Sequence, residues 1–255
     1  MSERPKILVL AGTPEARSLL RELAGRMPHL DILASFAGAV QDLPGIDVPV
    51  RVGGFGGADG LSTFLKGEQI SCLVDATHPF AQVISAHAAA AARQASVPLL
   101  RLERPAWEPN PEDQWIAAAS LDEAASLLPE GSKPLIAAGR KEIGRFTHRG
   151  DLSAVVRMIE PPGTVLPGSW HLILEKPSAE TAEEKKLLSD HGITHVVSKN
   201  SGGRMSYAKI AAAAALGLPV VMVQRPELAP ARTFSSVEAI LEELKQMPQL
   251  QAAGC

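Results

Sequence analysis

Lys199, Asn200 and Ser201 follow an apolar run and precede two glycines in the stretch VVSKNSGGRMSYAKIAAAAA. The lysine carries a point charge, the amide and the hydroxyl offer hydrogen-bond donors, and Gly202 and Gly203 allow a ligand to come close to the backbone. A polar loop between a buried strand and a helix is typical of an anion site. A simple glycine turn would not need three polar residues before it, so the sequence predicts a binding site at this loop.

A second candidate is VRVGGFGGADGL, where five glycines, from Gly53 to Gly60, fall within eight residues. Glycine lets the backbone approach a pyrophosphate closely and lets a helix pack tightly against a strand. A loop that is merely flexible needs fewer glycines. We therefore favour a ligand-binding role for this loop.

The loop LAGTPEAR places Gly12 and Thr13 between a strand and a helix that begins at Pro14. Backbone N–H groups at a helix start, together with the Thr13 hydroxyl, suit a phosphate. Thr13 is equally suited to the N-cap of the helix, with Gly12 forming a tight turn. The spacing leaves both interpretations open.

The stretch VDATHPFA ends a predicted strand at Asp75 and puts Thr77 and His78 in the loop that follows. A histidine there is able to donate a proton or bind a carboxylate. The alternative is a histidine that caps a turn beside Pro79, and the spacing by itself favours this capping role.

Two other kinds of chemistry are not supported. His191 and His195 are four residues apart, but Gly192 separates the end of a helix from the start of a strand, so no zinc site is predicted. The chain also has no G-x-S-x-G motif and no Cys–His arrangement, which disfavours covalent acyl transfer.

The elements that must position these loops alternate along the chain. Apolar runs at 6–11, 70–76 and 97–102 predict buried strands, and the segments 14–26 and 80–95 predict helices. Such alternation indicates α/β structure with parallel sheets covered on both faces. The polar loops then lie at the carboxyl ends of strands, where open sheets of this type bind ligands.

The two halves of the chain resemble each other. Laying residues 77–105 on 198–226 without gaps gives seven identities in 29, three of them alanine. The order of parts is also the same: strand, polar loop, alanine-rich helix, proline-led strand, Arg-Pro. We therefore predict two similar α/β domains, at 1–125 and 126–250.

Composition narrows the class of protein. The net charge is −3 and aromatic residues make up 4% of the chain, so neither nucleic acid nor an anionic membrane is an expected partner. No apolar run is long enough for a membrane span, and no signal peptide is apparent. The two cysteines, Cys72 and Cys255, form no disulfide framework, and a cytoplasmic location is the simplest interpretation.

With these loops in view, the chain resembles the precorrin-6A reductase family of cobalamin biosynthesis. The matching segments run in order from residue 7 to residue 226 and are ILVLAGTPEAR, VRVGGFGGADGL, VDATHPFAQVIS, PLLRLERPAW, AAGRKEIGRF and VVSKNSGGRMSYAKIAAAAALGLPVVMVQRP. The combination of GGFGG, DATHPFA and KNSGG is specific, although each motif alone is not.

The resemblance implies two Rossmann-like domains with mainly parallel sheets and an active site in the cleft between them. It implies an oxidoreductase in which NADPH, or NADH, gives a hydride to a ring double bond of precorrin-6A or of its cobalt form. A proton from solvent or a side chain would complete the reduction. The substrate is then a tetrapyrrole with many carboxylates, which basic side chains are suited to bind. No metal cofactor is expected, and the oligomeric state stays open.

The resemblance also implies roles for particular residues. The residues expected at the cofactor are Gly12, Thr13, Ser35, Gly38, Gly53, Gly54, Phe55, Gly56 and Gly57. Those expected at the substrate are Thr77, Lys199, Asn200, Ser201, Gly202 and Gly203. Arg104 and Arg140 are added to them as basic residues near predicted strand ends, where a polyacid could bind. His78 is the candidate catalytic acid.

The chain departs from the family pattern in two places. In SFAGAV, Ala39 stands where the family has an arginine that could bind a 2′-phosphate, which leaves the choice between NADPH and NADH open. After WHLILE, the residues Lys176, Pro177 and Ser178 replace an expected Arg-Gly-Pro-Phe, so substrate contacts there should differ.

Two alternative functions remain. A glycine-rich loop after a strand also suits S-adenosylmethionine, so a methyltransferase of the same pathway is one alternative. A non-catalytic two-domain protein that binds an anion is the other. A titration with NADPH, monitored by its fluorescence, distinguishes a reductase from a methyltransferase, which should not respond. Oxidation of the nicotinamide distinguishes a reductase from a protein that only binds an anion.

Overall fold

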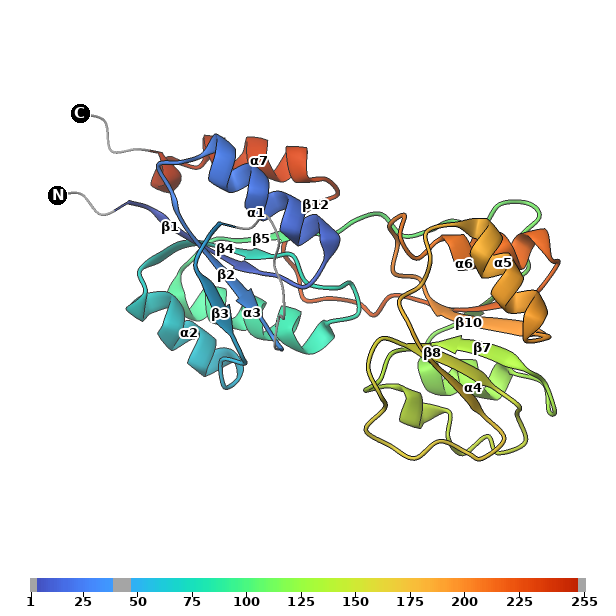
Figure 1. The fold of residues 1–255 in the computed structure, drawn as a ribbon. Helices are drawn as coiled ribbons and strands as arrows, with labels where there is room; N and C mark the ends of the chain where they lie inside the picture. The colour runs from blue at the N-terminus through green and yellow to red at the C-terminus, as the bar shows by residue number, and fades with distance from the viewer. Residues whose placement is uncertain (1–3, 39–46, 252–255) are drawn as a thin grey trace. The chain divides into compact units, whose positions relative to one another are not determined.

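The chain forms two compact units in a computed structural model that describes residues 4–38 and 47–251. Unit 1 contains the described residues of segments 1–104 and 227–255, and unit 2 contains residues 105–226. Each unit is built on a six-stranded sheet with helices on its faces (Figure 1). The predicted class, two Rossmann-like α/β domains, is confirmed.

The sheet of unit 1 has the Rossmann strand order. Its strands are β1 (Lys6–Leu10), β2 (Asp31–Phe36), β3 (Val50–Val52), β4 (Ile70–Asp75), β5 (Leu99–Leu102) and β12 (Arg232–Phe234). They lie in the order β3-β2-β1-β4-β5-β12, and every pair is parallel. Read by position, this is the 3-2-1-4-5-6 order of dinucleotide-binding sheets.

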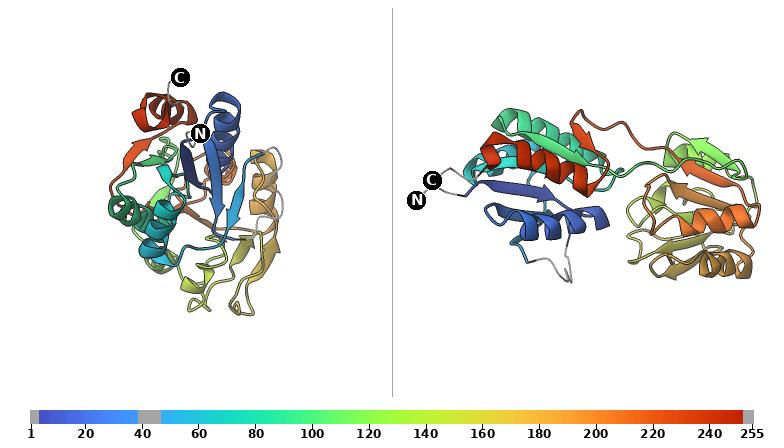
Figure 2. Two further views of the ribbon diagram at one scale, coloured as in Figure 1. Left: turned by 90° about the vertical axis from the view of Figure 1, so that its left-hand side faces the viewer. Right: turned by 90° about the horizontal axis from the view of Figure 1, so that it is seen from above.

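Four helices cover this sheet. They are α1 (Pro14–Arg26), α2 (Gly57–Gly67), α3 (Gln82–Ala95) and α7 (Val237–Gln246), and a short 3-10 turn, η2 (Pro248–Leu250), follows the last of them. α1 and α7 lie side by side on one face (Figure 2), and α2 and α3 cover the other. Consecutive β1 residues point to opposite faces, so Ile7 belongs to the core with Leu20 of α1, and Leu8 to the core with Leu61 of α2. The apolar run of β1 therefore reflects burial on both sides.

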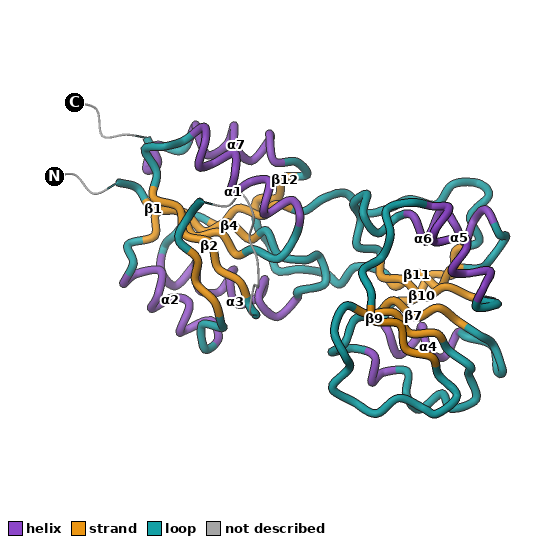
Figure 3. Tube along the Cα trace, in the orientation of Figure 1, coloured by secondary structure: helices purple, strands orange, loops and turns teal. Residues whose placement is uncertain are grey.

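Unit 2 repeats this plan. Its strands are β6 (Trp115–Ala118), β7 (Pro134–Ala137), β8 (Val155–Met158), β9 (His171–Leu174), β10 (His195–Lys199) and β11 (Val220–Val223). Its helices are α4 (Leu121–Leu127), α5 (Thr181–Asp190), α6 (Ala208–Ala215) and the 3-10 turn η1 (Ile143–Arg145). The parallel order is β9-β8-β7-β10-β11-β6, with α5 and α6 on one face and α4 on the other (Figure 3).

The sixth strand of each sheet comes from the other half of the sequence. β6 follows β5 in the chain but pairs with β11, and β12 follows β11 but pairs with β5. Each exchanged strand leads into a helix with a serine N-cap, Ser120 for α4 and Ser236 for α7. The chain thus passes between the units twice, at Arg104-Pro105 and at Pro226-Glu227.

This exchange explains why the units differ from the predicted domains 1–125 and 126–250. The predicted boundary follows the sequence repeat, and the repeat is real, because the gapless alignment places β5 on β11 residue for residue. However, β6 and α4 fold with unit 2, while β12 and α7 fold with unit 1. In the part of the chain that is described, no helix has the length and apolar composition needed to cross a membrane.

Candidate functional site

The loops after β1 and β4 lie at the topological switch point of unit 1. From β1 the chain continues to β2 on one side, whereas β4 lies on the other side of β1 and continues to β5. The two loops are joined by hydrogen bonds, because the Thr13 hydroxyl donates to the Ala76 carbonyl (2.9 Å) and the Ala76 N–H donates to Leu10 (2.9 Å). Dinucleotides bind at this point in sheets of this order.

Thr13 is the N-cap of α1. Its hydroxyl oxygen accepts from the Ala16 N–H (3.1 Å), and its side chain is buried. The hydroxyl proton is already given to Ala76, so the capping alternative describes this side chain. A phosphate contact from this loop would therefore come from backbone N–H groups, which Gly12 leaves uncovered, since a Cβ there would meet no atom within 4 Å.

The glycine loop after β3 also has a bare backbone. Gly53, Gly56 and Gly57 have φ angles of 108°, 79° and 91°, a region that side chains with a Cβ rarely adopt. A Cβ added at any of these three, or at Gly54, would meet nothing within 4 Å. The N-cap of α2, Gly56, makes no side-chain capping bond. The loop therefore fits the close approach of a pyrophosphate that the motif predicts.

Arg51, which the sequence reasoning did not single out, holds this loop from β3. Its two Nη atoms donate to the carbonyls of Gly53 (2.5 Å) and Gly54 (2.7 Å), and its guanidinium carbon lies 3.9 Å from the centre of the Phe55 ring. On the other side, a Cβ at Gly60 would lie 1.8 Å from the Phe55 carbonyl oxygen, so only glycine fits. The available signal was an arginine two residues before the first glycine, separated from it by Val52.

The end of β2 contributes the two remaining predicted cofactor residues. Ser35 is buried and lies in register with Leu10 of β1 and Arg51 of β3, and its carbonyl accepts from the Ala11 N–H (2.8 Å). Gly38 is exposed just beyond the strand, and Ala39 lies outside the described residues. Ser35 and Gly38 thus lie at the carboxyl end of β2, the strand that pairs with β1.

A buried polar cluster follows β4. Asp75 accepts from the Thr77 N–H (3.2 Å) and hydroxyl (2.7 Å) through Oδ1, and from Arg101 Nε (3.3 Å) through Oδ2. The Thr77 and Ser85 hydroxyls are 3.5 Å apart. Asp75 and Arg101 are only 1% and 5% exposed, so the pair is held in a medium of low dielectric, where it fixes the loop that carries Thr77.

His78 lies on this loop at the border of a hollow. Its Nδ1 accepts from the Phe80 N–H (3.3 Å), as the capping alternative predicts. A neutral imidazole that accepts at Nδ1 carries its proton on Nε2. The hollow is too narrow to hold a water molecule and is also lined by Asp75, Thr77, Ser85 and Arg101. His78 is therefore both a turn cap and a side chain at a concave surface.

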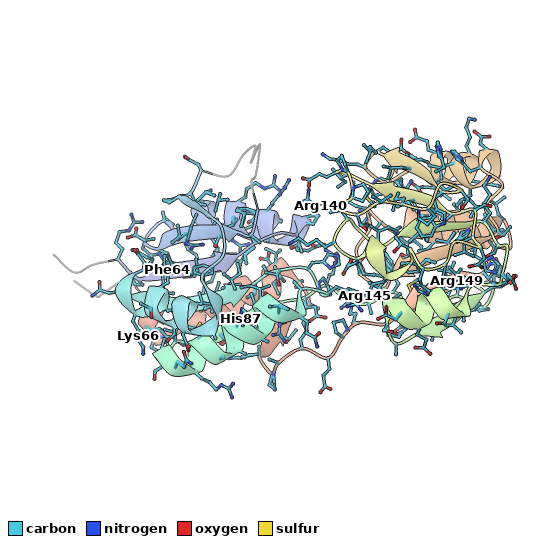
Figure 4. The ribbon with its side chains drawn as sticks, turned by 90° about the horizontal axis from the view of Figure 1, so that it is seen from below. Phe64, Lys66, His87, Arg140, Arg145 and Arg149 are labelled. Carbon is cyan, nitrogen blue, oxygen red and sulfur yellow. The ribbon has the colours of Figure 1, made fainter. Side chains whose placement is uncertain are left out.

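The three basic residues predicted at the substrate are each paired with a carboxylate. Arg104 donates to Glu15 (2.5 Å), in the first turn of α1. In unit 2, Lys199 donates to Glu142 (2.5 Å). Arg140, exposed on the loop after β7 (Figure 4), donates to Glu160 (2.5 Å). A substrate carboxylate would have to compete with these partners.

Asn200, after β10, is bound to a residue far away in the sequence. Its Oδ1 accepts from the Trp107 N–H (2.8 Å), and its Nδ2 donates to the Trp107 carbonyl (2.9 Å). The Trp107 indole donates to the Gly203 carbonyl (3.0 Å). Both amide atoms of Asn200 thus fasten the segment that follows the first passage between units.

The same loop also fastens the second passage. Arg225 donates to the carbonyls of Asn200 (2.9 Å) and Ser201 (3.1 Å). Gly202 has a φ of 69°, and a Cβ there would lie 2.1 Å from the Pro105 oxygen and 2.6 Å from an Arg225 nitrogen. We call this arrangement of Trp107, Arg225 and the loop 200–203 the crossover clasp. It explains much of why the loop is polar and glycine-rich.

Two other possible kinds of site, a reactive thiol and a metal centre, find no support among the described residues. Burial raises the pKa of the Cys72 thiol to about 12, so it is a poor nucleophile. Within residues 4–38 and 47–251, no group of three or more His, Cys, Asp or Glu side chains could hold a metal ion.

The strand order, repeated in both units, and the bare glycine loop at the carboxyl end of β3 define a protein of two Rossmann-like domains. The chain belongs to the precorrin-6x reductase CbiJ/CobK family, whose model matches residues 6–245. The match spans both units. It supports a reductase over the methyltransferase and the non-catalytic binding protein.

Individual relatives agree with this family. The chain is 43% identical over 228 residues to a precorrin-6A reductase from Rhodococcus erythropolis, covering 89% of this chain and 91% of that protein. It is 28% identical over 253 residues to a cobalt-precorrin-6A reductase from Priestia megaterium, covering 93% and 97%. A solved structure described as CobK precorrin-6A reductase superimposes with a TM-score of 0.85 at 33% identity, covering 94% of this chain and 96% of that one.

Proposed function

We propose that this protein reduces a ring double bond of precorrin-6A in cobalamin biosynthesis, with NADPH or NADH as the hydride donor. The observation that carries the proposal is the family match over residues 6–245, together with 43% identity to precorrin-6A reductases over both units. The bare glycine loop of unit 1 supports the dinucleotide part of the proposal.

The metal-free substrate is favoured over its cobalt form. Relatives described as precorrin-6A reductases reach 43% identity, as in Sinorhizobium sp over 245 residues, whereas those described as cobalt-precorrin-6A reductases reach 28% and 29%. The alignments in both groups span most of this chain, 95% with the Sinorhizobium sp protein and 93% and 89% with the two cobalt-precorrin-6A reductases.

The dinucleotide, when bound, supplies the hydride. The chain's own groups would bind and orient it: the backbone N–H groups at Gly12 and at the loop 53–57, where no side chain covers the backbone, would be open to its phosphates. The first turns of α1 and α2 add the positive ends of their helix dipoles. Because hydride transfer needs the donor and acceptor carbons in contact, most of the rate should come from this positioning.

The substrate is a polyacid, and its proposed contacts are Thr77, Arg104, Arg140, Lys199 and the loop 200–203. In this proposal Arg104, Arg140 and Lys199 exchange a glutamate partner for a substrate carboxylate, with no net loss of a charge pair. The loop 200–203 contributes through the clasp, which fixes where Lys199 lies. His78 is the proposed proton donor, through the proton on Nε2.

The test measures NADPH oxidation with precorrin-6A and, separately, with cobalt-precorrin-6A. Mass spectrometry then gives the mass of the product. We expect absorbance loss that depends on precorrin-6A and a product heavier by two hydrogens. A parallel reaction with S-adenosylmethionine in place of NADPH is the control. A product heavier by one methyl group, or binding without nicotinamide oxidation, would overturn the proposal.

A further inference from the structure

We propose that Arg51 selects NADPH over NADH by binding the 2′-phosphate of the adenosine ribose. The inference deepens the proposed function and rests on it. In Rossmann sheets this ribose lies at the carboxyl end of the second strand, where an acidic side chain binds a 2′-hydroxyl or an arginine accommodates a 2′-phosphate.

Arg51 is next to that strand end. β3 pairs with β2 in parallel, with Arg51 in register with Ser35 and Val52 with Phe36, the last residue of β2. The Arg51 side chain extends toward the carboxyl edge, because its nitrogens reach the carbonyls of Gly53 and Gly54, which follow β3. Its guanidinium therefore lies where the adenosine ribose is expected.

The charge of Arg51 is not neutralised by a carboxylate of the described residues. Its recorded partners are two carbonyl oxygens and the faces of Phe55 (3.9 Å) and Phe64 (5.3 Å). The described residues at the end of β2, 35–38, include no acidic side chain that would bind a 2′-hydroxyl and repel a phosphate. By contrast, Arg104 and Lys199 each have a glutamate within 2.5 Å.

Arg51 is also held in place before any ligand arrives. Two hydrogen bonds and stacking on Phe55 fix the guanidinium plane, so little side-chain entropy is lost on binding. Arginine has five N–H donors, and the two recorded bonds leave others for a phosphate of about −1.5 to −2 charge. The same bonds hold the glycine loop, so a phosphate at Arg51 would also steady the loop beneath the pyrophosphate.

The experiment compares two fragments that need no turnover, 2′,5′-ADP and 5′-AMP, by calorimetric titration. We expect the wild-type protein to bind 2′,5′-ADP at least about tenfold more tightly, and Arg51→Gln to lose that preference while its affinity for 5′-AMP changes less than about threefold. Arg51→Lys, which keeps the charge, should retain part of the preference. Arg93→Gln, an exposed arginine in the last turn of α3, removes the same charge far from β2 and should change neither affinity.

Three results would overturn the inference. The first is an equal affinity of the wild-type protein for 2′,5′-ADP and 5′-AMP, and the second is a preference for 2′,5′-ADP that survives in Arg51→Gln. The third is an equal loss of affinity for both fragments in the variants, which would mean that Arg51 only supports the loop. Should Arg51→Gln fail to fold, the inference is still tested by the preference of the wild-type protein for 2′,5′-ADP and by the smaller preference expected of Arg51→Lys. Failure of the proposed reaction is separate, because it appears as no oxidation of NADPH by precorrin-6A whatever the fragment affinities.

Discussion

The side-chain amide of Asn200 pairs with the backbone of Trp107 as a neighbouring strand would. It accepts from the Trp107 N–H at 2.8 Å and donates to the Trp107 carbonyl at 2.9 Å, across 93 residues of sequence. Asn200 itself is 5% exposed. A buried backbone N–H and carbonyl need partners, and here one side chain supplies both.

Asn200→Ala should therefore destabilise the protein. Both Trp107 groups would lose their partner in a partly buried setting, at a cost of about 1–3 kcal/mol in the free energy of unfolding. Asn200→Asp keeps the shape but opposes a carboxylate to the Trp107 carbonyl, so we expect a similar loss. Urea denaturation measures both. Asn110→Ala is the control, since this amide is exposed and should change stability by less than about 0.5 kcal/mol; equal losses at Asn110 and Asn200 would contradict the clasp.

Gly202→Ala tests the clasp from the backbone side. The new Cβ would overlap the Pro105 oxygen and an Arg225 nitrogen at a φ of 69°, and we expect a cost of about 2–5 kcal/mol from backbone strain and overpacking. Gly217→Ala is matched in φ (63°) but meets nothing within 4 Å, so it should cost only about 1–2 kcal/mol. Thermal unfolding of both variants decides, and similar losses would show that the crossing segment does not confine Gly202.

The alternation of apolar runs with helices predicted the parallel sheets, but the sequence repeat did not predict which strands and helices make up each unit. Strand and loop patterns are local, and they identified β1, β4, β5, β10 and β11 with their polar loops. A strand follows each Arg-Pro pair, and tertiary structure decides which sheet it joins. The two strands, β6 and β12, pair with equivalent strands, β11 and β5. Nothing local distinguishes one edge from the other, so the predicted boundary followed the repeat.

The same limit applies to the site. The glycine loop at 53–57 was predictable because positive φ angles require glycine locally. Asn200 was assigned to a ligand, and its bonds to Trp107 had no local signal, since the partner is remote. Arg51 was passed over because its role depends on where the carbonyls of Gly53 and Gly54 point, which only the folded loop determines.

The buried Lys209 should make the stability of the protein depend on pH. It lies buried in α6, where its Nζ donates to the Ser206 carbonyl (2.7 Å) and lies 5.4 Å from the centre of the Trp107 ring. Burial, and then the charge of Arg157, lower the pKa of Lys209 from 10.5 to about 7, against a smaller opposing effect of Glu184. Between these pH values the unfolded chain binds a proton that the folded chain has released.

Stability should therefore rise as pH increases from about 7 to about 10.5, by an amount on the order of a few kcal/mol from this group. Lys209→Met should remove that rise, as measured by urea denaturation at intervals of pH. Lys66→Met, at an exposed position on α2 (Figure 4), is the control and should leave the rise in place. A rise that persists in Lys209→Met would show that another group produces it.

The two proposed roles of His78 depend on different nitrogens of its ring. Capping uses Nδ1, which accepts from the Phe80 N–H, whereas proton donation would use Nε2. Asparagine has an oxygen able to replace Nδ1 as acceptor but has no group that replaces the imidazole as an acid near neutral pH. His78→Ala removes both functions and His78→Asn removes only the second.

If His78 is the acid, both variants should lose about 10²–10⁴-fold in kcat while the dissociation constant for NADPH changes little. Single-turnover reduction of precorrin-6A and a separate NADPH titration measure the two quantities. A structural role alone would make His78→Asn nearly as active as the wild type and His78→Ala less stable to heat. Full turnover in His78→Asn would thus remove His78 from the chemistry and leave solvent or the substrate's own carboxyl groups as the source of the proton.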